Sequence, residues 1–169
     1  MHSTATLDKL AKIITVFILL LLLFIGYQIL DRGEGPVTIG RAILDSLLFF
    51  VVVFCYFYST KGYSIQNGKL VIERPIGKKV ISLKKLKGIY DYKKIEKGFT
   101  MRTFGNGGLF GYFGYFTNDK IGRFKLFSTK RKDFYILDFG KEKIGISPDQ
   151  PEFVEALKGY INKQDEPQS

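Results

Sequence analysis

The chain has 169 residues, with 26 lysine and arginine side chains, 16 aspartate and glutamate side chains, and a net charge of +10. This length accommodates one ordinary domain and a smaller segment. His2 is the only histidine and Cys55 the only cysteine, which excludes a histidine-dependent triad, a histidine-based zinc site and a disulfide framework. The carboxylates are scattered and indicate no acid–base pair. We therefore expect a protein that is not an enzyme, with no catalytic residues, no cofactor and no metal site.

The first sixty residues contain two strongly apolar runs. Residues 13–30 carry no charge, and residues 42–58 carry Asp45 as their one charged side chain. Roughly 20 apolar residues cross the ~30 Å hydrocarbon layer of a membrane. We expect residues 1–60 to form a transmembrane hairpin with helices at about 10–30 and 40–58. The first run is too long for a signal peptide and has no cleavage pattern after it, so it is interpreted as a retained anchor.

The distribution of positive charge predicts the orientation of this hairpin. Residues 1–60 contain four basic and four acidic side chains, so the whole net charge of +10 lies in residues 61–169. Lysine and arginine accumulate on the cytoplasmic side of membrane helices. We expect both termini and the following domain to be cytoplasmic, with a short turn outside. Asp45, four residues after Arg41, is either an intramembrane ion site or half of a boundary ion pair.

After residue 60 the chain changes to short β-rich runs separated by turn signals. The pair Asn67-Gly68 supplies the two positive-φ residues of a type I′ hairpin. About seven strands are expected, with the aromatic stretch 102–116 between the fourth and the fifth. The seven runs are residues 63–66, 69–74, 78–83, 89–92, 123–127, 134–139 and 143–147.

The end of the domain has the pattern of an amphipathic helix. Asp149 and Glu152 have the spacing of an N-terminal capping box. Apolar residues then recur at helical spacing and form one stripe, which consists of Phe153, Ala156, Leu157, Tyr160 and Ile161. We expect the domain to span 61–162 and the polar tail 163–169 to be frayed, as we expect the segment around His2 to be flexible.

This outline resembles the bacterial PH-like (pleckstrin-homology-like) domain families that follow a two-helix membrane anchor. Three stretches carry the resemblance: RTFGNGGLFGYFG (102–114), IGRFKLFSTKRKD (121–133) and GISPDQPEFVEAL (145–157). The resemblance implies a mainly β fold, namely a PH-like roll of about seven antiparallel strands with a C-terminal capping α-helix, preceded by two transmembrane α-helices. It also implies a protein integral to the bacterial cytoplasmic membrane.

The aromatic stretch between Arg102 and Phe116 has glycines at every third position from Gly108 to Gly114. It lacks the Gly-Lys-Ser/Thr ending of a P-loop and the last glycine of a dinucleotide-binding motif. We interpret it as a glycine-hinged loop and strand, with alternate aromatics in the core and the others on an interaction surface. The alternative is that these residues are all structural. The candidate interaction surface consists of Arg102, Phe104, Leu109, Phe110 and Tyr112.

The lysine clusters of the domain allow two interpretations. They are either solvated strand edges and turns or contacts to anionic lipid headgroups, each worth about 1 kcal/mol near the surface. The candidate headgroup contacts are Lys78, Lys79, Lys84, Lys85 and Lys87. Nucleic acid is a weaker candidate partner, because a domain tethered to a bilayer meets anionic lipid first.

These observations favour a membrane-anchored, non-enzymatic PH-like domain that acts as a scaffold or sensor. It would bind a protein partner, or a second copy of itself, at the inner membrane surface. The main alternative is a module that binds anionic lipid. A third and weaker alternative is an accessory subunit of a membrane transport system that uses Asp45.

Overall fold

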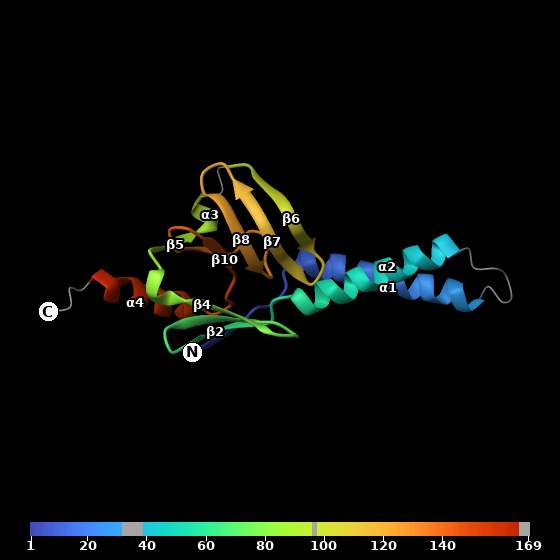
Figure 1. Ribbon diagram of the computed structural model, residues 1–169, viewed down its shortest axis with the longest axis horizontal. Helices are drawn as coiled ribbons and strands as arrows, with labels where there is room; N and C mark the ends of the chain where they lie inside the picture. Colours follow the sequence, from blue (N-terminus) through green and yellow to red (C-terminus); the bar gives the residue numbers. More distant parts are fainter. Residues whose placement is uncertain (32–38, 96–97, 166–169) are drawn as a thin grey trace.

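The computed structural model describes residues 1–31, 39–95 and 98–165. A helical hairpin extends from one side of a β-rich domain, and the C-terminal helix lies at the opposite end (Figure 1). The hairpin, called the anchor below, consists of α1 (Lys9–Asp31) and α2 (Ile39–Tyr58). Both helices were expected at about these positions. The turn expected between them, residues 32–38, lies outside the described residues.

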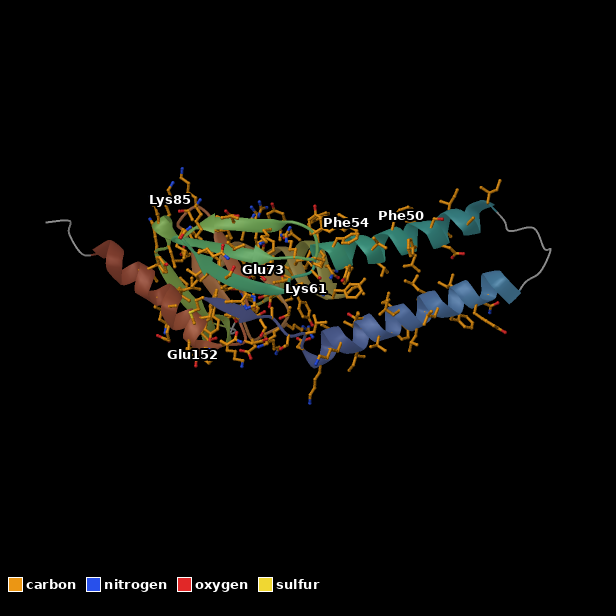
Figure 2. The ribbon with its side chains drawn as sticks, turned by 90° about the horizontal axis from the view of Figure 1, so that it is seen from below. Phe50, Phe54, Lys61, Glu73, Lys85 and Glu152 are labelled. Carbon is orange, nitrogen blue, oxygen red and sulfur yellow. The ribbon has the colours of Figure 1, made fainter. Side chains whose placement is uncertain are left out.

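The two helices differ in how clearly they could cross a membrane. Within the described parts of the chain, Lys9–Gln28 is the one helical stretch long and apolar enough to do so, whereas the apolar stretch Ala42–Tyr58 of α2 is shorter. Side chains on both helices nonetheless point away from the protein, as Figure 2 shows. Phe17 is 64% exposed and Phe50 is 67% exposed. An apolar surface of this extent is suited to contact with lipid.

Within the described residues, ten strands form two sheets, and the larger of two buried clusters contains side chains from both. Sheet A has the order β1-β2-β3-β4, and sheet B has the order β5-β9-β10-β8-β7-β6. Sheet A contains β1 (His2–Thr4), β2 (Gly62–Gln66), β3 (Lys69–Glu73) and β4 (Lys78–Ser82). Sheet B contains β5 (Gly88–Asp91), β6 (Thr100–Gly108), β7 (Gly111–Asn118), β8 (Gly122–Ser128), β9 (Tyr135–Asp138) and β10 (Lys143–Ile146). The short helices are η1 (Leu83–Lys85) and α3 (Tyr92–Ile95), and the C-terminal helix is α4 (Pro151–Asp165).

The expected mainly β fold with a C-terminal helix is confirmed, and the structure corrects three details. The stretch expected as a loop and strand forms two strands, β6 and β7, joined by a turn at Leu109-Phe110. The expectation that all strands are antiparallel is wrong for β8 and β10, which run parallel because the β9–β10 hairpin places β10 between β9 and β8. Helix α4 continues to Asp165, beyond the apolar stripe that ends at Ile161.

The N-terminal segment, residues 1–8, forms part of the domain and is called the strap below. The expectation that the segment around His2 is flexible is wrong, because β1 pairs with β2 in the register His2↔Ser64. The N-terminal ammonium group of Met1 donates to the carbonyl oxygen of Ile65 at 3.2 Å. At the other end of the strap, the backbone N–H of Asp8 donates to the carbonyl of Thr129 at 3.0 Å. The chain therefore contributes a strand to sheet A before it enters α1.

Local sequence signals account for the main elements of the core. Asn67 and Gly68 adopt φ values of 49° and 68°, so the expected hairpin turn is confirmed. Phe153 and Leu157, from the predicted apolar stripe of α4, are fully buried. Buried Tyr63 connects the two sheets, since its hydroxyl donates to the carbonyl of Phe127 at 2.6 Å.

Two facing glycines allow the β6–β7 hairpin to pack closely. Gly105 pairs with Gly114 across the two strands, and their φ values are 121° and 130°. A Cβ atom on Gly105 would meet the backbone of Phe113, and one on Gly114 would meet the backbone of Phe104. Only glycine fits these positions without strain, which explains two of the glycines in the aromatic stretch.

Candidate ligand cleft between the anchor and the domain

The tip of the β6–β7 hairpin packs against the ends of both anchor helices. The backbone N–H of Phe110 donates to Oγ1 of Thr15 in α1 at 2.9 Å. The ring of Phe110 meets the ring of Tyr56 in α2 edge to face, with centroids 5.4 Å apart. Phe110 has a φ of 57°, and Leu109 is partly buried against the core. The tip therefore fixes the position of the domain relative to the anchor.

Beside this contact lies a cleft of about 660 Å³ between α2, sheet A and sheet B, called the junction cleft below. Its α2 wall is apolar and consists of Val51, Phe54, Cys55 and Tyr58. Its basic side chains come from both sheets and are Arg74, Lys79, Arg102 and Lys125. The remaining wall is formed by apolar side chains of sheet B, namely Phe104, Leu109, Phe113, Tyr115 and Phe127.

Arg74 is the central basic group of the junction cleft. Its guanidinium carbon lies 5.2 Å from the ring centroid of Tyr58 and 5.1 Å from that of Phe127. Its Nε is buried without a hydrogen-bond acceptor, and Arg74 forms no ion pair within the residues that the structure describes. Burial lowers the pKa of this guanidinium. A buried cationic donor without an acceptor is costly, and an anionic ligand would remove that cost.

Two lysines complete the positive region around Arg74. Lys79 Nζ lies 5.3 Å from the ring centroid of Phe127, and burial, followed by the positive charge of Lys125, lowers its pKa. Lys125 contacts Glu142 at 2.6 Å, and this hydrogen bond raises the pKa of Lys125. Glu142 thus offsets one charge of the cleft, while Lys79 has no ion-pair partner among the described side chains.

The junction cleft supplies positive charge at the domain side and apolar surface at the anchor side. Aromatic rings hold the cationic groups in place through cation–π contacts, so the basic side chains are positioned before any ligand arrives. This arrangement suits an amphipathic molecule with an anionic group directed to Arg74 and an apolar part along α2.

The structure distributes the expected interaction surface over different environments. Arg102, Phe104 and Leu109 line the junction cleft, and Phe104 is 76% exposed. Phe110 contacts the anchor instead of a free surface. The expectation that Tyr112 lies on the surface is wrong, because its side chain is 4% exposed; it packs with the aromatic cluster on the other face of sheet B.

The expected headgroup lysines also separate into two groups. Lys79 lies in the junction cleft, and exposed Lys78 precedes it at the start of β4. Lys84 and Lys85 belong to η1, and Figure 2 shows Lys85 at the end of the domain away from the anchor. Lys87 follows η1 and donates its backbone N–H to the carbonyl of Asp138. The structure therefore does not bring Lys84 and Lys85 to the anchor side.

Several residues of the cleft were missed by reasoning from the sequence. Arg74 was assigned only to the end of a strand, and Tyr58 only to the end of an apolar run. Lys125 lies in a run with basic and apolar residues at alternate positions, a pattern that places it on one face of β8. What the sequence did not indicate is that Arg74, Tyr58 and Lys125 meet, since they come from three separate elements.

Comparison with known protein families matches residues 61–161 to the family described as bacterial PH domain. Searches of the curated proteins and of the solved structures find no match. The family match covers more than half of the chain and includes β2 to β10 and most of α4. The resemblance seen in the sequence is thus confirmed, and the chain belongs to the bacterial PH domain family.

Proposed function

We propose that this chain is a membrane-anchored, non-enzymatic binding module that holds an anionic lipid in its junction cleft. The observation that carries the proposal is the position of Arg74, a half-buried guanidinium that lies between two aromatic rings and whose Nε has no hydrogen-bond partner among the described residues. Lys79 and Lys125 lie in the same cleft. Membership of the bacterial PH domain family supports a binding role in general. The cleft supplies the basic and apolar side chains that an anionic lipid requires.

The relation of the cleft to the anchor favours a lipid over a soluble anion. One wall consists of α2 residues, including Val51 and Phe54, from the helix that we interpret as the second membrane span. A lipid in the adjacent leaflet would place its acyl chains along this wall and its headgroup beside Arg74. The concentration of lysine and arginine in residues 61–169 supports the proposal that this leaflet is the cytoplasmic one.

The scaffold function expected from the sequence remains a second candidate because of one observation. Strand β6 is an edge of sheet B, and apolar side chains near it are exposed: Phe99 by 72%, Met101 by 54% and Phe104 by 76%. An exposed edge with apolar side chains is suited to a protein partner or to a second copy of the chain.

The lipid function is tested with the full chain in mild detergent, titrated with phosphatidylglycerol or with zwitterionic phosphatidylcholine and followed by native mass spectrometry. Arg74→Gln combined with Lys79→Gln should weaken phosphatidylglycerol binding by about tenfold or more, since each basic contact contributes about 1 kcal/mol. The matched control is Lys84→Gln combined with Lys85→Gln, which removes the same charge far from the anchor. Equal losses in the two variants, or equal binding of both lipids, would contradict the proposal.

Salt and self-association distinguish the two candidate functions. Headgroup attraction should weaken as the salt concentration rises, whereas a packed protein interface should persist. The scaffold function would instead be supported by a dimer that persists at high salt in sedimentation experiments. The Met101→Ser change should dissociate this dimer and leave phosphatidylglycerol binding unchanged.

A further inference from the structure

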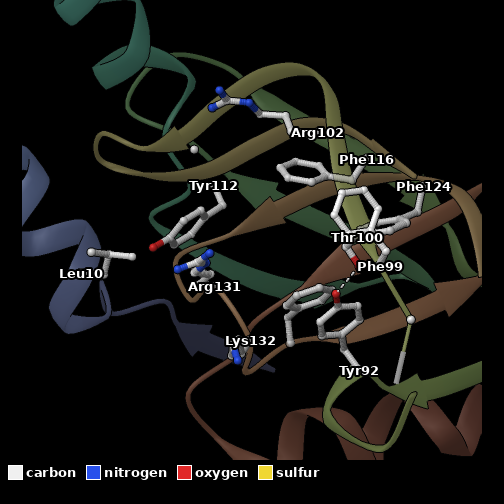
Figure 3. A pocket seen from close by; sticks show the side chains of 13 residues that line it. Leu10, Tyr92, Phe99, Thr100, Arg102, Tyr112, Phe116, Phe124, Arg131 and Lys132 are labelled. Carbon is white, nitrogen blue, oxygen red and sulfur yellow. Dashed lines mark hydrogen bonds between the residues drawn. The ribbon is translucent and has the colours of Figure 1, made fainter. Parts of the chain in front are cut away.

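A second cleft lies on the opposite face of sheet B and is called the aromatic cleft below (Figure 3). It has a volume of about 620 Å³, within the range of roughly 300–1,000 Å³ that is common for small-molecule sites. One half is lined by aromatic rings that pack on one another. Tyr92 stacks on Phe134 with centroids 4.1 Å apart, and Phe116 stacks on Phe124 with centroids 5.9 Å apart. Phe99, 72% exposed, completes this half.

The other half of the aromatic cleft is basic. Arg131 and Lys132, from the loop between β8 and β9, line it together with Arg102 of β6. Figure 3 shows Arg131 beside Tyr112, between Leu10 of α1 and the aromatic rings. The side chain of Arg131 is exposed. No aspartate or glutamate lines this cleft in the part of the chain that the structure describes.

Asp8, which contacts both Tyr112 and Arg131, already has hydrogen-bond donors of its own. Asp8 accepts from the backbone N–H of Ala11 and of Arg131, each at 2.8 Å, and from the hydroxyl of Tyr112 at 3.3 Å. Asp133, which follows Lys132 in the chain, contacts Lys93 at 3.1 Å. Among the described residues, three basic side chains and no carboxylate line the cleft, so one end of it is basic and the other is aromatic.

We propose that the aromatic cleft binds a small organic anion with a flat conjugated ring. The ring lies against the aromatic half, where offset and edge contacts between rings are favourable. The acidic group, a carboxylate or a phosphate, is held by Arg131 and its basic neighbours through charge-assisted hydrogen bonds. The site does not depend on the lipid function of the junction cleft, with which it shares only Arg102.

A small molecule fits this cleft better than a peptide segment. Extended peptides commonly add to a sheet through the backbone groups of an edge strand. The aromatic cleft instead lies on the face of sheet B, where β7 and β8 are paired on both sides. Side chains therefore provide its recognition groups, with room for one ring system and one acidic group.

The test uses 2-naphthoate as the probe and the full chain in phosphatidylcholine nanodiscs, with heats measured by titration calorimetry. Empty nanodiscs correct for partition of the probe into lipid. We expect saturable binding at one site per chain. The uncharged 2-naphthylmethanol and the non-planar cyclohexanecarboxylate should each bind at least about tenfold more weakly, because each lacks one half of the recognised chemistry.

Two variants assign the binding to this cleft without disturbing the core. The Arg131→Gln change keeps the hydrogen bond from the backbone N–H of residue 131 to Asp8. It should weaken naphthoate binding about tenfold, because the guanidinium group is lost. Phe99→Ser removes an exposed ring and should weaken it several-fold. The matched control Lys79→Gln, in the junction cleft, should leave naphthoate binding unchanged even if it abolishes lipid binding.

The proposal is overturned if naphthoate shows no saturable binding, or if Arg131→Gln binds it as well as the native chain does. Equal binding of 2-naphthylmethanol would also overturn it, since the basic half would then play no part. Tighter binding of a peptide that contains phenylalanine and glutamate than of naphthoate would assign the cleft to a protein segment instead.

Discussion

Phe110 and Thr15 are joined by a hydrogen bond of 2.9 Å from the backbone N–H of the first to Oγ1 of the second, across 95 residues of sequence. The bond connects the tip of the β6–β7 hairpin to α1, the first helix of the anchor. Since Phe110 also contacts Tyr56 of α2, the hairpin tip is held by both helices. The aromatic stretch thus serves as a mechanical connection between the domain and the anchor.

Replacing Thr15 with valine should weaken this connection. The change keeps the size of the side chain but leaves the partly buried N–H of Phe110 without its acceptor, at a cost of about 1–2 kcal/mol. For a chain of this size, the thermal unfolding midpoint in detergent micelles should fall by about 2–6 °C. The matched control Thr15→Ser retains the oxygen and should unfold close to the native midpoint. An unchanged midpoint for the valine variant would show that the bond contributes nothing to stability.

Two glycines of the same hairpin should respond very differently to alanine. Gly114 has a φ of 130° and faces backbone atoms of Phe104, so Gly114→Ala should destabilise the domain by about 3 kcal/mol or more through strain and steric conflict. Gly107 meets only the flexible end of the Arg102 side chain, and Gly107→Ala should therefore cost less than about 1 kcal/mol. Chemical denaturation of both variants checks the difference, and similar losses would contradict it.

The strap makes part of the stability depend on pH through Asp149. Burial alone would raise the pKa of this carboxyl, but hydrogen bonds from Lys130, Thr6 and Thr4 lower it below its ordinary value of 3.8. The folded carboxylate therefore stays charged where the unfolded one takes up a proton. Its contribution to stability is complete above pH 3.8 and is lost as the pH falls through the lower folded pKa.

This dependence is tested by comparing the free energy of unfolding of the native chain with that of the Asp149→Asn variant at several pH values. At pH 7 the variant should be less stable by about 1–2 kcal/mol, because its single amide oxygen replaces only one of the two carboxylate oxygens that accept from Thr4, Thr6 and Lys130, and its NH2 group then faces other donors. The difference should shrink when unfolding is measured below pH 4. A difference that is constant from pH 7 to pH 3 would assign the loss to packing and not to charge.

The expected orientation of the anchor is tested by cysteine labelling in intact cells. A membrane-impermeant maleimide should label the Gly35→Cys variant from outside intact cells. It should label the Ser169→Cys variant only after the membrane is permeabilised. The native Cys55 is buried, so the unmodified chain serves as the background control. Labelling of Ser169→Cys in intact cells would reverse the proposed orientation.

The sequence predicted those elements that local chemistry determines. The pair Asn67-Gly68 favours a type I′ turn because both residues readily adopt positive φ values. The apolar stripe that contains Phe153 and Leu157 predicts a helix that is buried on one face. Side chains alternate between the two faces of β7 as expected, but both faces are buried here, since Phe113 packs in one buried cluster and Tyr112 in the other. These features depend on neighbours a few residues apart.

The candidate site could be predicted only in part, because its contacts join distant segments. Nothing near Arg74 in the sequence indicates that Tyr58 and Phe127 will enclose it. Similarly, Leu109 and Phe110 have the composition of an exposed tip, but the tip meets the anchor. The pairing of β1 was missed because a strand of three polar residues, His2 to Thr4, has no apolar periodicity.

The order of the strap, the anchor and sheet A along the chain has a consequence for biogenesis. Strand β1 is made before both helices, while its partner β2 is made after them. Sheet A can close only when residues 1–8 and residues 62–66 lie at the same end of the two anchor helices. A chain that inserts with its N-terminus across the membrane loses the pairing of β1 and the bond from Arg131 to Asp8. If both helices cross a bilayer, the pairing of β1 with β2 favours the topology in which the N-terminus and the domain share one side.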